Sequence, residues 1–272
     1  MVIEVKRFCL LFFVASLLLS GCKLNLKAFE DDDKALIEVI RYDRLESQYL
    51  TTGDYSALQQ MNTEYPVETR ILIEDVLKIG DVSDPKINNR FLAFYQDSIL
   101  QRLISDAELQ YANMDDVNVG LCNAFARLDK FLPGVPVPQV YAQIGALDQS
   151  IVIGNNTIGI SLDKYLGENY SLYLKYYEKS QRKTMARSNI VPDCINFYLL
   201  SLYPLTDSEQ RPQIDRDIHM GKVQWVCNLV LERKFFDNRY VSVIDRYMSK
   251  NRAMPIKSLL ENNDYTEIKK EI

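Results

Sequence analysis

Histidine is almost absent from this chain of 272 residues, since His219 is the only one. Catalytic zinc sites usually take at least one or two imidazole ligands, and a serine or cysteine nucleophile needs a histidine base. A standard zinc centre and a catalytic triad are therefore not expected. No phosphate-binding loop is expected either, because Gly154, Gly159 and Gly167 lack the accompanying lysine and the required spacing.

An excess of positive charge is also missing. The chain has 32 Lys and Arg against 37 Asp and Glu, a formal net charge of -5. Removing the first 21 residues removes Glu4, Lys6 and Arg7, a net of +1, and leaves about -6. Phosphate backbones are bound by clustered Lys and Arg, so nucleic acid is not expected as a partner.

Long apolar runs are missing too. The run from Phe8 to Leu19 is shorter than the roughly 20 residues that span a bilayer. It follows Lys6 and Arg7 and ends at Ser20-Gly21-Cys22, the pattern of a signal peptide over residues 1–21. Leu19 to Cys22 resembles the bacterial lipobox, whose cysteine is acylated, for example with palmitate, and becomes the new N-terminus. Cys22 is the predicted lipid attachment site.

The lipid defines the expected location. Residues 22–34 are predicted to be the lipid anchor and tether, so the membrane is a partner through the acyl chains. Lys23, rather than Asp, follows Cys22, which favours the outer membrane and leaves open the periplasmic or the surface leaflet. The run Asp31 to Asp33 is interpreted as a solvated linker or as part of a surface-export signal.

Cysteines are few, and their number argues against disulfides. Of five, Cys9 leaves with the signal peptide and Cys22 carries lipid. Cys122, Cys194 and Cys227 are an odd number among apolar neighbours, which predicts free thiols that pack as small apolar side chains.

Ten Gly and nine Pro are few for a β-sandwich or a propeller of this size. No linker or repeat divides residues 35–272, so one globular domain is expected, with a charged end over 261–272 that frays. Ile151 to Leu162 predicts a hairpin that turns at residues 154–156, and a strand is expected around Val140 to Ile144. The apolar run from Pro192 to Tyr203 predicts a buried helix.

Apolar spacing predicts further helices over 43–50, 68–79, 86–104, 115–132, 219–232 and 241–250, after an early strand or short apolar run at 37–40. The expected fold class is α+β, mainly helical, with a small sheet or hairpin packed on a buried central helix.

Five segments carry a family resemblance. They are IRYDRLESQY (40–49), FARLDKFLPGVPVPQVY (125–141), SLDKYLG (161–167), IVPDCIN (190–196) and GKVQWVCNLVL (221–231). In this order they resemble the gliding-motility lipoproteins of Bacteroidetes named GldB. The resemblance implies a zincin-like, metallopeptidase-type architecture in which the buried helix should carry His-Glu-x-x-His. Positions 192–196 read Pro-Asp-Cys-Ile-Asn instead.

Neither Pro192 nor Asn196 can replace a histidine ligand, since proline has no donor atom and an amide oxygen binds zinc poorly. His219 and Cys227 are eight positions apart on one predicted helix, a rise of about 12 Å, too far to share an ion. Cys194 and Cys227 with a carboxylate are the remaining conceivable zinc ligands. No metal site, catalytic residue or cofactor is therefore predicted.

Four residues are candidates for a cleft between hairpin and helix: Asp163, Tyr165, Asp193 and Asn196. Asp193 follows a proline at a helix start, where a carboxylate stabilises the N-terminus without any further role. Its other interpretation is a polar contact in the cleft. Asp163 is interpreted as a capping residue at a strand end or as a pocket residue, and His219 as a polar residue at a helix start.

The expected function is that of a non-catalytic, lipid-anchored envelope protein that binds other envelope proteins of the gliding or secretion machinery. One alternative is a hydrolase with a non-standard carboxylate or thiolate site. The other is glycan binding by the tyrosines 165, 170, 173, 176 and 177, which are otherwise interpreted as a helix with rings inward and hydroxyls outward.

Overall fold

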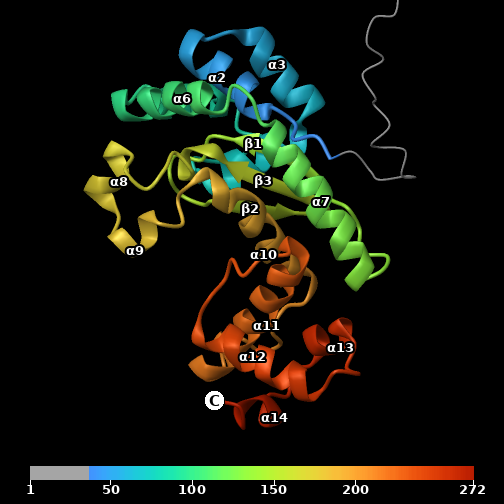
Figure 1. Ribbon diagram of the computed structural model, residues 1–272. Helices are drawn as coiled ribbons and strands as arrows, with labels where there is room; N and C mark the ends of the chain where they lie inside the picture. Colours follow the sequence, from blue (N-terminus) through green and yellow to red (C-terminus); the bar gives the residue numbers. More distant parts are fainter. Residues whose placement is uncertain (1–36) are drawn as a thin grey trace, which may run out of the picture. The chain divides into compact units, whose positions relative to one another are not determined.

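A small mixed sheet lies among the helices of the computed structural model, which describes residues 37–272 (Figure 1). The strands are β1 (Gln139–Gln143), β2 (Ile151–Gly154) and β3 (Thr157–Ser161), in the order β1-β3-β2. β1 is parallel to β3, and β2 is antiparallel to it. The predicted hairpin is confirmed, with Asn156 at φ 60° in its turn. The predicted signal peptide, Cys22 and the tether lie outside the described residues.

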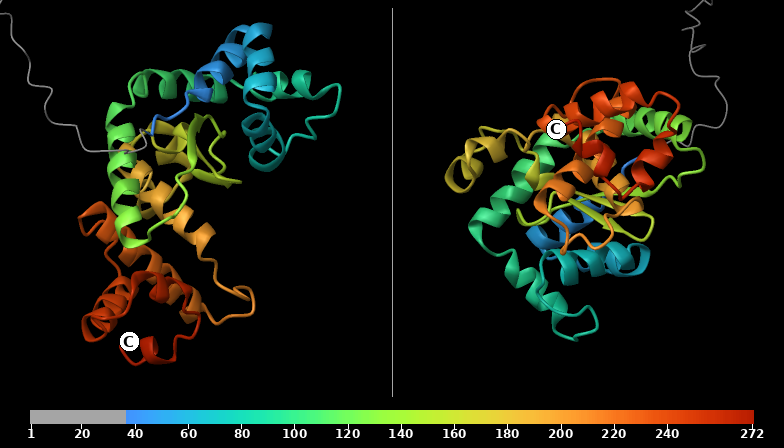
Figure 2. Two further views of the ribbon diagram at one scale, coloured as in Figure 1. Left: turned by 90° about the vertical axis from the view of Figure 1, so that its right-hand side faces the viewer. Right: turned by 90° about the horizontal axis from the view of Figure 1, so that it is seen from below.

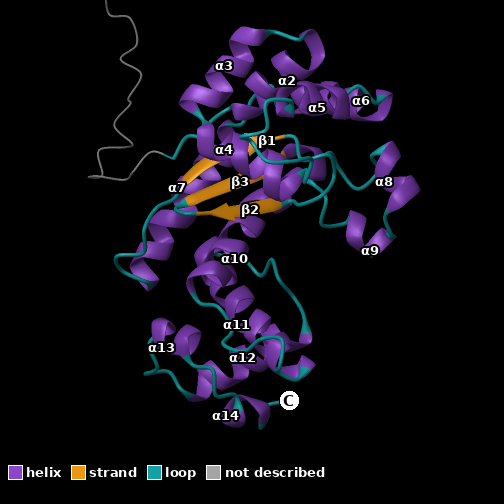
Figure 3. Cartoon of the chain, turned by 180° about the vertical axis from the view of Figure 1, so that it is seen from behind, coloured by secondary structure: helices purple, strands orange, loops and turns teal. Residues whose placement is uncertain are grey.

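The predicted buried helix is α10 (Ile190–Leu202), which packs against β2 and β3. Pro192 lies in its first turn, where its missing N–H leaves no hydrogen bond unmade. Helix α2 (Tyr42–Thr52) contacts β1 at the edge of the sheet (Figures 1 and 3). Helix α7 (Asp115–Phe131) contacts α10. The α+β class, mainly helical, is confirmed. The early apolar segment contributes only one bridge, between Ile40 and Tyr141.

The helix predicted over 86–104 is wrong as a single element. The chain forms α5 (Ile87–Phe94) and α6 (Ser98–Gln110), because the Asp97 side chain accepts from the N–H of Ile99 at 2.8 Å and starts a new helix. The break turns Tyr95 into the core, where its hydroxyl donates to the carbonyl of Ile144 at 2.6 Å.

The remaining elements of the N-terminal part are α3 (Tyr55–Glu64), which apolar spacing did not predict, α4 (Pro66–Arg70), the π-helix η1 (Ile71–Val76), η2 (Leu162–Lys164), α8 (Ser171–Tyr176), α9 (Lys179–Arg182) and η3 (Arg187–Asn189). The segment predicted as one helix over 68–79 is thus α4 continued by η1.

The C-terminal helices form a second hydrophobic cluster. They are α11 (Gln213–Leu231), α12 (Arg239–Lys250), α13 (Ile256–Glu261) and α14 (Thr266–Lys269), which Figure 2 shows gathered together in orange and red. α11 starts six residues before the predicted helix at 219. Tyr265 and Ile268 are buried in this cluster, so the end that its charge predicted to fray is packed against α11 and α12.

Candidate functional site

A hydrogen bond joins the end of the hairpin to the start of the buried helix. Tyr165 follows β3 after the short turn η2, and Asp193 lies in the first turn of α10. The Tyr165 hydroxyl donates to Oδ2 of Asp193 at 2.8 Å. Burial raises the pKa of Asp193 to about 6, and the bond from Tyr165 opposes that rise. Asp193 therefore occupies a helix start and also makes the contact with the hairpin end.

Asn196 lies one turn further along α10. It is 5% exposed, and its Oδ1 has no hydrogen-bond partner within residues 37–272. Cys194 and Cys227 are fully buried, and burial raises the pKa of both thiols well above the usual value. The donors at 192–196 do not fit the zinc that a zincin-like scaffold implies, and no three His, Cys, Asp or Glu side chains between 37 and 272 are placed to hold a metal.

Asp163 holds a strained loop. This carboxylate is fully buried and accepts from the N–H of Gly145 at 2.7 Å and of Leu147 at 2.5 Å. Ala146 and Leu147 have φ of 50° and 65°, left-handed conformations that cost free energy in residues other than glycine. Lys164 adds a bond from Nζ to the carbonyl of Leu147 at 3.1 Å. Asp163 therefore caps the backbone that leaves β1.

A second buried carboxylate, Glu46 of α2, binds the same backbone. Its Oε2 accepts from the N–H of Ile144 at 2.8 Å, while Oε1 and the buried Oε1 of Gln143 have no partner in the described part of the chain. Burial raises the pKa of Glu46, and the nearby Asp163 adds to the rise. The sequence offered one signal for this residue: Glu46 lies one turn from Tyr42 and from Leu50, on the apolar face of its helix.

The hydroxyls of Tyr165 and Tyr173 point inward, so the prediction that they face outward is wrong for these two residues, whereas Tyr176 is exposed. The Tyr173 hydroxyl donates to the carbonyl of Asp163 and accepts from the N–H of Leu166. Tyr111, which sequence reasoning missed, donates to the carbonyl of Tyr165 at 2.6 Å. These bonds replace water for groups that the fold buries.

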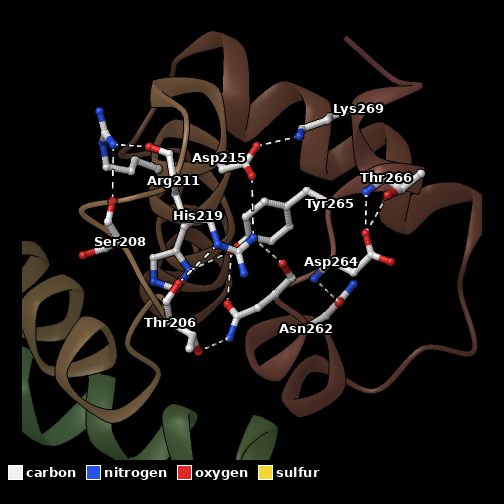
Figure 4. A network of polar contacts seen from close by, with 12 residues as sticks. Thr206, Ser208, Arg211, Asp215, His219, Asn262, Asp264, Tyr265, Thr266 and Lys269 are labelled. Atoms are coloured by element: carbon white, nitrogen blue, oxygen red, sulfur yellow. Dashed lines mark hydrogen bonds and ion pairs between the residues drawn. The ribbon is translucent and has the colours of Figure 1, made fainter.

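His219 belongs to a polar network in the C-terminal cluster (Figure 4). It lies inside α11 rather than at a helix start, and its Nδ1 is 3.2 Å from the Tyr265 hydroxyl. Burial lowers the pKa of His219 to about 4. Asp215, one turn earlier, pairs with Lys269 at 2.7 Å and with Arg211 at 3.6 Å. The network fastens the C-terminal segment to α11.

Lys222 continues this face of α11 and is fully buried. Its Nζ donates to the carbonyls of Leu260 at 3.3 Å and Asn262 at 2.5 Å, and lies 4.8 Å from the Tyr265 ring centre. Carbonyl groups at the end of α13 and an aromatic face are suitable partners for an ammonium group. Sequence reasoning missed this residue, which lies between Gly221 and Val223 in the chain.

The fold and this junction define an α+β protein whose hairpin and central helix are fixed by buried tyrosines and carboxylates, with no histidine at positions 192–196 of that helix. The family model of gliding motility protein GldB matches residues 27–235, and the chain belongs to this family. It is therefore a protein related to gliding motility. No curated protein and no solved structure matches the chain. Among residues 37–272, no helix combines the length and apolarity needed to cross a membrane.

The raised pKa of Asp193 predicts a pH-dependent effect of Asp193→Asn. A carboxyl whose folded-state pKa is raised stabilises the fold when protonated, and this stability is lost as pH rises from about 4 through 6. The amide keeps an oxygen acceptor for Tyr165. At pH 8 we expect the variant to be more stable than the wild type by about 1–2 kcal/mol, a figure that allows for the lost attraction between the carboxylate and the helix N-terminus. At pH 3.5 we expect no gain in stability.

Urea unfolding at the two pH values measures this difference. Asp115→Asn, at the start of α7, is the matched control, because its carboxylate is exposed at a helix start. A stability gain that is the same at both pH values would show that the titration of Asp193 is not its source.

Proposed function

We propose that this protein is a lipid-anchored component of the cell envelope that acts without catalysis, by binding other envelope proteins of the gliding or associated secretion machinery. The observation that carries the proposal is the composition of the buried helix. Positions 192–196 lack the pair of histidines that holds zinc in a zincin, and the side chains of Tyr165 and Asp193 are used to join hairpin and helix. Membership of the GldB family supplies the motility setting.

The anchor rests on the N-terminal sequence. A basic start, a short apolar run and Leu19-Ser20-Gly21-Cys22 support cleavage before Cys22 and acylation of its thiol. Each buried CH₂ contributes about 0.8 kcal/mol, so two or three acyl chains hold a domain on a bilayer without a spanning helix. Lys23 after Cys22 favours the outer membrane. Nucleic acid and cofactors have no place in this function.

Labelling with radioactive palmitate tests the anchor. We expect Cys22→Ala to abolish incorporation and to release the chain from the membrane fraction. Cys122→Ala is the matched control, because Cys122 belongs to α7 and lacks a preceding lipobox, and its label should equal that of the wild type. Label that persists in Cys22→Ala would contradict the anchor.

Rescue of a deletion strain tests the role. Chromosomal replacement by Asp193→Asn should leave surface spreading and secretion unchanged, since that exchange preserves the bond from Tyr165, whereas Cys22→Ala should lose both. Affinity purification of the intact lipoprotein from its own membrane identifies the partners. Peptide hydrolysis by the purified protein that disappears in Asp193→Asn would overturn the non-catalytic assignment in favour of a hydrolase.

A further inference from the structure

Residues 167–186 form an arm that follows the hairpin and precedes the central helix in the chain. A bridge between Leu166 and Ala186 closes its base, with a bond from the N–H of Gly167 to the carbonyl of Met185 at 2.9 Å. Nη1 of Arg182 donates to the carbonyl of Glu168 at 3.0 Å. The arm carries α8 and α9, which extend away from the sheet in Figures 1 and 3. It is a built projection with a fixed base.

The inner side of the arm joins the core, where Tyr173 and Met185 are buried and Tyr170, Leu172 and Tyr177 are partly buried. Tyr173 is the buried residue of α8, and α9 has none. Next to Tyr173, Leu174 is 56% exposed and Tyr176 is 55% exposed, with the exposed Lys175 between them. Leu174 and Tyr176 therefore lie on either side of Lys175, whose Nζ is 5.0 Å from the Tyr176 ring centre. Apolar and aromatic side chains that stay this exposed on a projection can mark a contact site.

The charge of the arm is opposite to that of the chain. Residues 167–186 include four basic side chains and two acidic ones, Glu168 and Glu178, whereas the whole chain has a formal net charge of -5. Three of the four are exposed lysines that form no ion pair within residues 37–272: Lys175, Lys179 and Lys183. An acidic protein thus presents unpaired ammonium groups around an apolar and aromatic pair.

We propose that the arm binds the surface of an anionic lipid bilayer, with Leu174 and Tyr176 inserted at the headgroup level and the three lysines against lipid phosphates. Tyrosine favours the boundary between headgroups and acyl chains, and lysines reach the phosphates with their long stems. The inference rests on the proposed lipid anchor, which keeps the domain near a bilayer and converts a weak contact into an intramolecular one. The acyl chains would hold this basic surface next to a bilayer, which is why lipid rather than an acidic protein is the proposed partner.

Vesicle sedimentation of an unlipidated chain tests the arm separately from the anchor. The chain from residue 22 on, carrying Cys22→Ala, is mixed with vesicles of phosphatidylcholine alone or of phosphatidylcholine with anionic phosphatidylglycerol. An anionic surface strengthens binding by about fivefold for each nearby lysine. We expect binding to the anionic vesicles that weakens with salt. Lys175→Gln, Lys179→Gln and Lys183→Gln together should reduce it about 100-fold. Leu174→Ser with Tyr176→Ser should reduce it at least about tenfold.

The matched control exchanges three exposed lysines elsewhere, Lys130, Lys234 and Lys257, for Gln and should bind vesicles as the parent does. All exchanges are at the surface, so unchanged thermal unfolding checks that the variants are folded. Equal loss in the control, or no binding to anionic vesicles, overturns the proposal. A photocrosslinker at position 176 that captures a protein in living cells, without vesicle binding, would assign the arm to a protein partner instead. Failure of palmitate labelling would remove the anchor and leave the vesicle result standing by itself.

Discussion

Gly221→Ala will destabilise the C-terminal cluster by about 2–3 kcal/mol, the range of overpacking in a tight core. Gly221 lies where α11 crosses the start of α12, and an added Cβ would be 2.7 Å from Cβ and 3.0 Å from the carbonyl carbon of Tyr240. The opposing atoms belong to a helix backbone, so the helices must separate. Alanine is intrinsically better in a helix by about 1 kcal/mol, which offsets only part of this cost.

Gly120→Ala is the matched control because it is also a helical glycine. Its Cβ would be 2.9 Å from Cγ2 of Val191, a side chain rather than backbone, so we expect a smaller loss of stability than for Gly221→Ala. Trp225 reports directly on the contact, since it is the only tryptophan and its Nε1 donates from α11 to Asp245 of α12 at 3.0 Å. Fluorescence-detected urea unfolding that is the same for Gly221→Ala and wild type would show that the crossing tolerates a Cβ.

Local pattern was sufficient to predict the hairpin and the buried helix. Two runs rich in β-branched residues on either side of Gly154-Asn155-Asn156 predict a hairpin. An apolar stretch that begins at a proline predicts a buried helix. The break at Asp97 was not predictable from apolar spacing, because the apolar residues on both sides of it keep the same helical period. The new helix starts there because the Asp97 side chain caps it. The extent of α11 was missed because most residues of its first two turns are polar, although Ile214 and Ile218 lie one turn apart there.

The candidate site was predicted in part. The sequence placed Tyr165 at the hairpin end near Asp193 at a helix start, but it did not predict the hydrogen bond between them. The hydrogen bonds of the Asp163 side chain could not be predicted, because they come from backbone N–H groups of a loop 16 and 18 residues earlier. Backbone partners carry no sequence signal. The same reason hid Lys222, whose partners are two carbonyl groups.

Asp163→Ala is the exchange at the hairpin–helix junction with the largest expected effect, a loss of about 3–5 kcal/mol. It leaves the N–H groups of Gly145 and Leu147 without an acceptor, at about 1–3 kcal/mol for each buried group. The same bonds hold Ala146 and Leu147 in left-handed conformations, so the loop after β1 should relax once they are gone. Asp163→Asn keeps one acceptor oxygen and should lose about half as much.

Asp148→Ala distinguishes the capping bonds from a general effect of charge near this loop. Asp148 is exposed beside the loop, and its side chain makes no hydrogen bond within residues 37–272, so its removal should change stability by less than about 0.5 kcal/mol. Urea unfolding gives the stabilities, and amide hydrogen exchange at Gly145 and Leu147 reports on the loop itself. If the Asp163→Ala variant retained protection at these two amides, another group would have to accept their hydrogen bonds. Glu46, which accepts from the neighbouring N–H of Ile144, would then be the next residue to exchange.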